Sequence, residues 1–256
     1  MAYISFLSDE HLLSCIETLY NVYEKSKDEF TLDKFYKNQI DPIKLLFDIN
    51  FFGISEEEVI AREIQRKIDK TISNAIGTFH EELLGGINGY TKHPVGNGFD
   101  ITDNQCKSLF ADIKNKHNTV KGSDLPNLYT DLEAYVNGKP NAKSYWVQII
   151  SSGQSFNENW TIPSHNKNNS NVYKVSADKF YEVLTGKSNA FSELCSALPI
   201  AIEDFLNSKQ LKPTISNINV YKKLCAKALK NNVSLSIQLM NDTFRNYNGF
   251  PIKNNI

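Results

Sequence analysis

The sequence predicts an α/β protein: a mixed central β-sheet flanked by helices, with helical N- and C-terminal regions. Three observations predict this class. Apolar residues recur every three or four positions toward both ends of the chain, short apolar stretches typical of strands lie between residues 99 and 175, and no linker rich in Pro, Ser or Gly divides the 256 residues. We therefore expect a single domain over residues 1–256, with a helical part at 1–86, a sheet core at 87–186 and a helical part at 187–256.

The first part is predicted to be helical because capping residues precede runs of helical periodicity. Ser8 caps the first run, and Asp41-Pro42 begins a later, short one. Ser55 and Glu58 form a capping box, after which apolar residues recur until Gly85-Gly86 stops the pattern. The expected helices cover residues 9–25, residues 31–36, a short piece from residue 42, and nearly thirty residues up to the two glycines.

Strands are predicted for the middle of the chain. Residues 99–102 and 106–114 are expected to form a hairpin joined by 103–105, and the near-continuous apolar stretch at 144–151 is typical of a central, buried strand. Residues 153–171 are polar and too many for a plain connector, which indicates a functional loop or disorder. The other expected elements are a helix at 125–136, a strand at 172–175, and helices at 178–184, 188–207, 218–230 and 233–246.

Composition and charge exclude several classes of function. Charged residues make up 22% of the chain with a net charge of −1, so any nucleic-acid binding must come from a local basic surface. The acidic N-terminus lacks the pattern of a signal peptide, and no apolar stretch reaches the roughly 18 residues of a membrane span, so we expect a cytoplasmic protein without a membrane partner. The cysteines stand singly, which favours structural thiols over a zinc site; they are Cys15, Cys106, Cys195 and Cys225.

The residues with chemical potential lie on the predicted hairpin. Asp100 is on its first strand, and Asp112 follows on the second after a gap of eleven residues. Lys114 falls on the same face as Asp112 because side chains alternate along a strand. Two carboxylates suffice for Mg²⁺, which takes few protein ligands, and the Ile113 carbonyl is a further ligand. With Lys114 orienting or polarising the attacking water, the set predicts metal-assisted phosphodiester hydrolysis.

A D-x-K triplet at a strand edge is common, so Asp112-Ile113-Lys114 alone indicates little. Three further features strengthen the interpretation as a site of metal-assisted phosphodiester hydrolysis, because all three would serve that reaction. They are an aspartate on the preceding strand, a long helix that ends in acidic residues, and a basic loop after the triplet. By themselves these residues support only a metal-assisted phosphodiesterase.

Several separated segments resemble a known family. Residues 99–100 and 111–119 resemble the PD-(D/E)xK nuclease motif, with Asp100 and Asp112 at its acidic positions and Lys114 at its lysine. Asp112 stands where many members have Glu, and Phe99 stands where the motif has proline; neither departure removes a catalytic group. More narrowly, the chain resembles the type II restriction endonucleases that cut GGNCC or GGWCC, in segments 74–85, 113–123 and 145–150.

The resemblance implies a restriction-endonuclease-like core and one endonuclease domain that cleaves double-stranded DNA at a short GGNCC-like palindrome, using Mg²⁺ and leaving 5′-phosphates. A palindromic site matches a two-fold dimer, so a homodimer is expected. The resemblance also implies a companion DNA methyltransferase of the same restriction-modification system, not necessarily bound. Two alternatives stay open: a structure-specific or repair nuclease of the same superfamily, and a non-catalytic DNA-binding protein.

Acidic residues at the end of the long helix are candidates to assist. Related nucleases often place a helix carboxylate near the metal, and we favour Glu81 over Glu82 for this position. The alternatives are solvated helix-end acids and, for His80, a structural histidine. Gln148 on the 144–151 strand either faces the site or is a buried, hydrogen-bonded glutamine.

DNA contacts are expected from residues that follow the catalytic strand, because a scissile phosphate would lie near them. These are Asn115, Lys116, His117, Asn118, Thr119 and Lys121, with Lys116 and Lys121 on backbone phosphates; a solvated basic loop is the alternative. With arginine only at 62, 66 and 245, other residues must contribute to base recognition. His165 and Lys167 in the 153–171 loop are the candidates.

Overall fold

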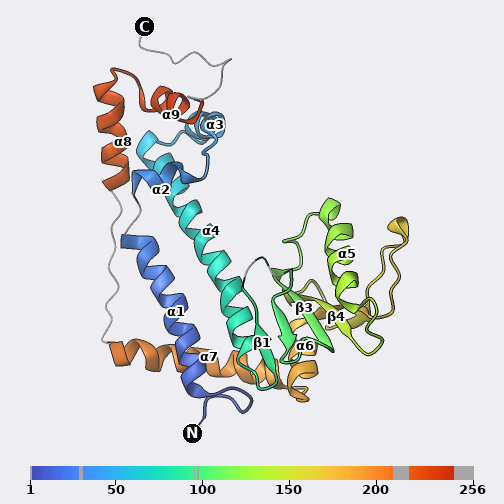
Figure 1. Ribbon diagram of the computed structural model, residues 1–256. Coiled ribbons are helices and arrows are strands. Elements are labelled where there is room, and N and C mark those ends of the chain that lie inside the picture. The colour runs from blue at the N-terminus through green and yellow to red at the C-terminus, as the bar shows by residue number, and fades with distance from the viewer. Residues whose placement is uncertain (1, 29–30, 95, 97, 210–218, 245–256) are drawn as a thin grey trace. The chain divides into compact units, whose positions relative to one another are not determined.

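The computed structural model describes residues 2–28, 31–94, 96, 98–209 and 219–244 (Figure 1). Contacts divide the chain into two compact units: Met1–Tyr20 with Asn74–Leu211, called here the sheet unit, and Asn21–Ser73 with Lys212–Ile256, called the helical unit. Helices α1 (Asp9–Asp28) and α4 (Glu56–Gly85) each contribute residues to both units. That the chain acts as one endonuclease domain stays a prediction.

The sheet unit contains a six-stranded mixed sheet in the order β1-β2-β3-β4-β6-β5. The first three strands in this order are antiparallel, β3, β4 and β6 run parallel, and β5 is antiparallel to β6. The predicted class, a mixed sheet flanked by helices with helical ends, is confirmed. The strands are β1 (Tyr90–Lys92), β2 (Ile101–Asp103), β3 (Leu109–Lys116), β4 (Lys143–Ile150), β5 (Asn157–Asn159) and β6 (Val172–Ser176).

Helices cover both faces of this sheet (Figure 1). On one face Leu109, Ala111 and Ile113 join a core that includes residues of α6 (Ala177–Thr185) and α7 (Ala190–Lys209). On the other face Phe110, with its strand neighbours, packs under α5 (Leu125–Val136). The predicted alternation along β3 is therefore correct, but its second face is core at the start of the strand and polar only farther along.

The helical unit packs around one apolar core formed by α2 (Leu32–Lys37), α3 (Pro42–Phe52), the first part of α4, α8 (Asn219–Lys230) and α9 (Leu235–Phe244). The predicted caps are present: the side chains of Ser8, Asp41 and Ser55 accept backbone N–H groups three residues on. Thr31, at the start of α2, does the same without having been predicted as a cap. Parts of the predicted helices 218–230 and 233–246 lie outside the described residues. These are residue 218 and residues 245–246, which include Arg245.

The structure differs from the predicted elements at three places. Strand β1 lies between the long helix and residue 99, where no strand is predicted, and β5 lies within the expected loop 153–171, where it pairs with β6. The hairpin turn is also longer than predicted, because the Asp103 carboxylate accepts hydrogen bonds from three backbone N–H groups, those of Lys107, Ser108 and Leu109, at 2.9–3.0 Å. This carboxylate ends β2 at Asp103 and delays the start of β3 to Leu109.

The predictions about thiols and membrane spans concern the whole chain. All four cysteines are free, and burial raises the pKa of Cys15 to about 12, which makes this thiol a poor nucleophile. Among the helices that the structure describes, we find none with the length and apolar character that crossing a membrane requires.

A close approach between the end of α4 and strand β1 gives a testable prediction. A Cβ at Gly85 would lie 2.6 Å from the Lys92 Cβ and 2.8 Å from its backbone nitrogen, whereas a Cβ at Gly77, earlier in α4, would meet nothing within 4 Å. We expect Gly85→Ala to lower the free energy of unfolding by about 1–3 kcal/mol, the usual cost of overpacking. The measurement is urea denaturation.

Gly77→Ala is the matched control. Because alanine is favoured over glycine inside a helix, this variant should be as stable as the parent or up to ~1 kcal/mol more stable. Equal effects of the two substitutions would contradict the packing argument.

Candidate active site

Asp100 is fixed between two strands immediately before β2. Its backbone N–H donates to the Ala111 carbonyl at 2.8 Å, and its carbonyl accepts the His93 N–H at 2.8 Å. Its side-chain Oδ2 accepts the backbone N–H of Ile113 at 2.7 Å. The carboxylate of Asp100 is thereby held against β3, the strand that carries Asp112.

Asp112 and Lys114 form an ion pair on the polar half of β3. The Lys114 Nζ lies 2.6 Å from Asp112 Oδ1, with 31% and 16% of the two side chains exposed. Among the described residues, no hydrogen bond to this buried oxygen is found besides the ion pair with Lys114. A carboxylate oxygen has more than one lone pair, so Asp112 keeps acceptor capacity beyond this contact.

Burial and neighbouring charge act together on the acids. Burial raises the pKa of Asp100; the hydrogen bond from Ile113 opposes this, and the nearby Asp112 carboxylate adds to it. Burial also raises the pKa of Glu81, followed in size by the charge of Asp100, while Lys92 and Lys114 act in the opposite direction. Glu81, Asp100, Asp112 and Lys114 therefore lie in one electrostatically coupled cluster, with Lys92 beside them.

The two acids at the end of α4 have different surroundings. Glu81 is 16% exposed and faces the charges of Asp100 and Lys114. Glu82 is 40% exposed, and its Oε1 lies 2.6 Å from the Lys92 Nζ, which is 3.8 Å from Glu81. The preferred residue, Glu81, is thus the one placed with the aspartates, although its part in catalysis stays a prediction. His80 is half-buried, and desolvation lowers its pKa to about 4, which keeps its imidazole neutral near pH 7. Its Nδ1 has no hydrogen-bond partner among the described residues, and the role of His80 stays a prediction.

Sequence reasoning missed two residues of this cluster. Lys92 lies on β1, a three-residue strand without a periodic signal. Tyr135 on α5 stacks on Phe110, and its pKa is raised by burial and then by Asp131, Asp112 and Asp100. Gly98 has a positive φ of 83°, and its Cβ would lie 1.8 Å from the Tyr135 hydroxyl, so glycine is required there. In the sequence, the glycine at position 98 is a signal of this close approach to Tyr135, because glycine has no Cβ.

A hollow of about 530 Å³ lies on the same face of the sheet as Asp112 and Lys114. Gln148 lines it, stands in register with Lys114 on the neighbouring strand, and is 5% exposed. No hydrogen bond to its side-chain amide is found within the described part of the chain. Of the two alternatives for this residue, the structure favours the one in which Gln148 faces the site.

The predicted DNA-contact residues after Asp112 continue directly from the cluster. Lys116 is the exposed last residue of β3, and the His117 N–H donates to the Ile150 carbonyl at 2.9 Å. His117 also lines the hollow. The remaining residues of this group follow in chain order: Asn115 is half-buried, and Asn118, Thr119 and Lys121 are exposed.

The two candidates in the 153–171 loop have other partners. His165 is exposed, with its Nδ1 3.0 Å from the Ser164 hydroxyl. The Lys167 Nζ lies 3.1 Å from a Glu133 carboxylate oxygen on α5. No contact within the described residues joins either of them to the acidic cluster.

The donor set fits a hard divalent cation. Asp100 and Asp112 offer carboxylate oxygens, one of them buried beside the Lys114 ammonium, and Mg²⁺ uses few protein ligands. Within the described residues, no three Asp, Glu, His or Cys side chains are arranged to hold a metal ion. The candidate side-chain ligands at this place are therefore the two aspartates, and the Ile113 carbonyl as a further ligand stays a prediction.

The mixed sheet with two aspartates and a lysine on adjoining strands defines an α/β protein with a restriction-endonuclease-like fold. The Eco47II restriction endonuclease family matches residues 4–207. The chain is 38% identical over 248 residues to the type II restriction enzyme Sau96I of Staphylococcus aureus, covering 93% of this chain and 94% of that enzyme. It is 35% identical over 219 residues to the type II restriction enzyme Eco47II of Escherichia coli, covering 82% and 90%.

The chain therefore belongs to the Eco47II restriction endonuclease family. The expectation of a type II restriction endonuclease, which rested on the resemblance more than on the three motif residues, is confirmed by this membership.

The raised pKa of Asp100 gives a prediction about stability. A carboxyl whose pKa is higher in the folded than in the unfolded state destabilises the fold as pH rises from the unfolded toward the folded pKa. At pH 7 in EDTA, Asp100→Asn should therefore unfold at a higher temperature than the parent, and the difference should shrink at acidic pH. Thermal unfolding followed by circular dichroism measures it.

Asp103→Asn is the control of opposite sign. Burial alone would raise the pKa of Asp103, but hydrogen bonds from the N–H groups of Leu109, Ser108 and Lys107 outweigh it and lower this pKa. Stability contributed by such a group is present above the unfolded pKa and lost as pH falls through the folded pKa. Asp103→Asn should thus be less stable than the parent at pH 7. If Asp100→Asn and Asp103→Asn were both more stable than the parent, the opposite directions assigned to the two pKa shifts would be wrong.

Proposed function

We propose that this chain hydrolyses double-stranded DNA at a GGNCC-like palindrome, with Mg²⁺ as cofactor, and leaves 5′-phosphates. The site consists of Asp100, Asp112 and Lys114 with assistance from Glu81, and Asp100, Asp112 and the Ile113 carbonyl hold the metal. The observation that carries the proposal is the buried Asp112 Oδ1, whose partner among the described residues is the Lys114 ammonium, in a chain of this family.

Each residue has a role that follows from its surroundings. Bound Mg²⁺ supplies Lewis-acid stabilisation of the phosphate and lowers the pKa of a coordinated water. Asp100 is oriented by the Ile113 N–H, so its outward oxygen is fixed before any ligand arrives. Lys114 offsets negative charge and orients the attacking water. Glu81, whose pKa is raised by burial and by Asp100, is suited to accept the proton of that water near neutral pH.

Contacts to DNA are assigned to the segment that follows the lysine. Lys116 and Lys121 bind backbone phosphates, which position the duplex, while Asn115, His117, Asn118 and Thr119 contact the DNA close to the scissile phosphate. His165 and Lys167 are the candidates for base contacts; Lys167 must first exchange its ion pair with Glu133.

The palindromic substrate implies the assembly. Each protomer cuts one strand, so the active form is a homodimer with two-fold symmetry. A companion DNA methyltransferase of the same system protects the host sites without having to bind this chain.

Loss of the metal-site residues should abolish cleavage while sparing DNA binding. We expect Asp112→Asn to leave no measurable cleavage and Lys114→Ala to slow it by about 10²–10⁴-fold, the usual range for one acid–base or charge-stabilising group. Plasmid cleavage and electrophoretic mobility shift measure the two properties, and excess EDTA should stop cleavage by the parent.

Lys107→Ala is the matched control, because Lys107 is an exposed lysine on the turn of the same hairpin. Its cleavage should equal that of the parent. Full cleavage in excess EDTA, or unchanged cleavage by Asp112→Asn, would overturn the metal mechanism.

Cut sites on a DNA of known sequence test the specificity. We expect discrete fragments whose 5′-phosphorylated ends map to GGNCC or GGWCC, and a light-scattering mass of twice the 29.1 kDa chain. End mapping also decides between any base pair and only A·T at the centre. A smear, or cutting confined to junctions, would instead indicate a structure-specific or repair nuclease. If the protein cleaves the DNA but light scattering gives the mass of one chain, the predicted dimer is wrong.

A further inference from the structure

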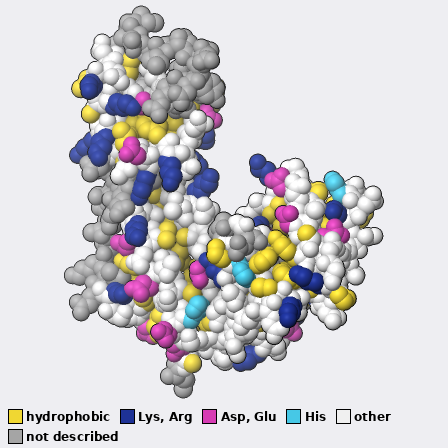
Figure 2. Space-filling model, viewed as in Figure 1, with side chains coloured by type: hydrophobic (Ala, Val, Ile, Leu, Met, Phe, Trp, Pro, Cys, Tyr) yellow, Lys and Arg dark blue, Asp and Glu magenta, His cyan; other side chains and the backbone are white. Residues whose placement is uncertain are grey.

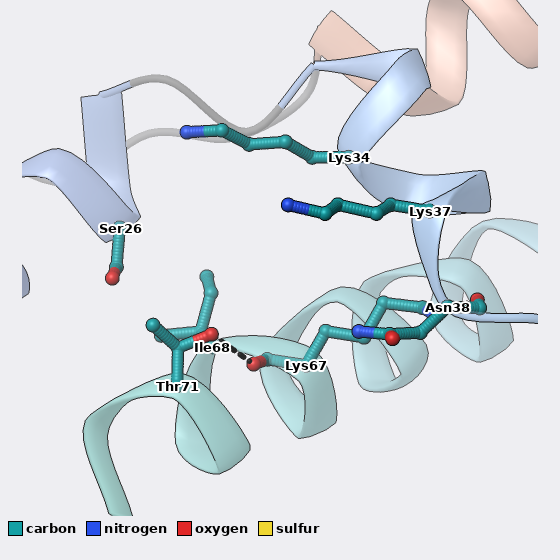
Figure 3. A pocket seen from close by; sticks show the side chains of 7 residues that line it. All are labelled: Ser26, Lys34, Lys37, Asn38, Lys67, Ile68 and Thr71. Carbon is teal, nitrogen blue, oxygen red and sulfur yellow. Dashed lines mark hydrogen bonds between the residues drawn. The ribbon is translucent and has the colours of Figure 1, made fainter. Parts of the chain in front are cut away.

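The helical unit contains a pocket that the proposed nuclease chemistry does not use. It has a volume of about 280 Å³ and lies between the end of α1, helix α2 and the middle of α4 (Figure 3). Three of its seven described lining residues are lysines and none is acidic. The lining consists of Ser26, Lys34, Lys37, Asn38, Lys67, Ile68 and Thr71.

Lys67 is a buried charge whose compensation is incomplete. Its side chain is 5% exposed, and its Nζ donates to the Asn38 carbonyl at 2.7 Å. Glu63 lies 3.5 Å from this Nζ, but both oxygens of Glu63 are bonded at 2.7 Å by Arg66. Glu63 is thus shared between two cations, Arg66 and Lys67, so these three side chains together carry one net positive charge beside the pocket.

Lys34 and Lys37 are directed toward the same space by the way α2 packs. Phe35 of this helix is fully buried in the core of the unit, so the lysines on its other side extend outward. They are three positions apart, which places them on one helix face. Figure 3 shows both side chains extending in the same direction, opposite Thr71 of α4.

We propose that this pocket binds a phosphate group, and that the group comes from the DNA backbone. A phosphate accepts hydrogen bonds on several oxygens, and the pocket has lysine ammonium groups and the Ser26 hydroxyl around a space that is large enough for it. The chain has a net charge of −1, so attraction to DNA has to come from local basic sites such as this one. Figure 2 shows many lysine and arginine side chains on the face of the helical unit that this view presents.

The choice of DNA as the source rests on the proposed function, whereas phosphate binding does not. The test uses the double variant Lys34→Gln/Lys37→Gln of the full chain. Lys222→Gln/Lys223→Gln is the matched control, because it removes two exposed lysines of the same unit, on α8. Lys67 is left in place because its burial makes a folding defect the expected result of replacing it.

The first measurement is binding to a duplex that contains a GGNCC site, in EDTA, over a range of salt concentrations. One phosphate contact contributes about 0.9 to the slope of log K against log salt. We expect the pocket variant to lose about one unit of slope and to bind about tenfold more weakly at ~0.1 M salt, with the control close to the parent. If the pocket variant and the control lost affinity and slope equally, the lysines would act only through the total charge of the protein, and the proposal would be overturned.

The second measurement is thermal unfolding with and without inorganic phosphate, in the absence of DNA. Stabilisation of the parent and control, but not of the pocket variant, supports a phosphate site. If this stabilisation is seen while the salt slope is unchanged, the ligand is a free phosphate and the DNA assignment is wrong; if neither effect is seen, the pocket binds no phosphate.

Cleavage of the same duplex by the parent with Mg²⁺ is recorded separately. If the parent does not cleave the duplex but the pocket variant still shows a smaller slope of log K against log salt, the nuclease proposal is wrong and the phosphate pocket is supported.

Discussion

The hydrogen bond from the Ile113 N–H to the Asp100 carboxylate is the contact on which the candidate site depends. It joins the start of β2 to the strand that carries Asp112 and Lys114, at a point where the backbone of Asp100 is also bonded to Ala111. A hairpin alone brings two strands together but leaves side chains free to rotate. This bond fixes one acid relative to the next, so that two carboxylates share a small, buried volume.

Holding acids this close is unfavourable without a cation. Burial and mutual repulsion raise the pKa of Asp100 and of Glu81, while Lys92 and Lys114 compensate only in part. The same electrostatics would favour a divalent ion at the proposed site, since the ion would remove the repulsion between the acids and would bind the Asp112 oxygen that Lys114 contacts. Strain of this kind at one place is typical of a site selected for chemistry over stability.

Much of the fold could be predicted from local signals. Helix α5 has its predicted bounds, and the capping box at Ser55 marks the start of α4 correctly, because caps and apolar periodicity act within a few residues. Strand β1 could not be predicted: three residues carry no period, and Tyr90–Lys92 become a strand only because β2 lies beside them. The extended hairpin turn was missed because one side chain, Asp103, bonds three N–H groups at once.

The same distinction separates the predictable part of the site from the rest. Asp112 and Lys114 follow from the strand period, and Asp100 follows once the hairpin is assumed. The choice between Glu81 and Glu82 needs the rotation of α4 about its axis, which helical periodicity does not give, and the end of this helix packs closely on Lys92 at Gly85. Lys92 and Tyr135 enter the cluster through that contact and through packing on Phe110, respectively. Tertiary packing, which no local pattern encodes, thus decides which charged groups surround Asp100 and Asp112.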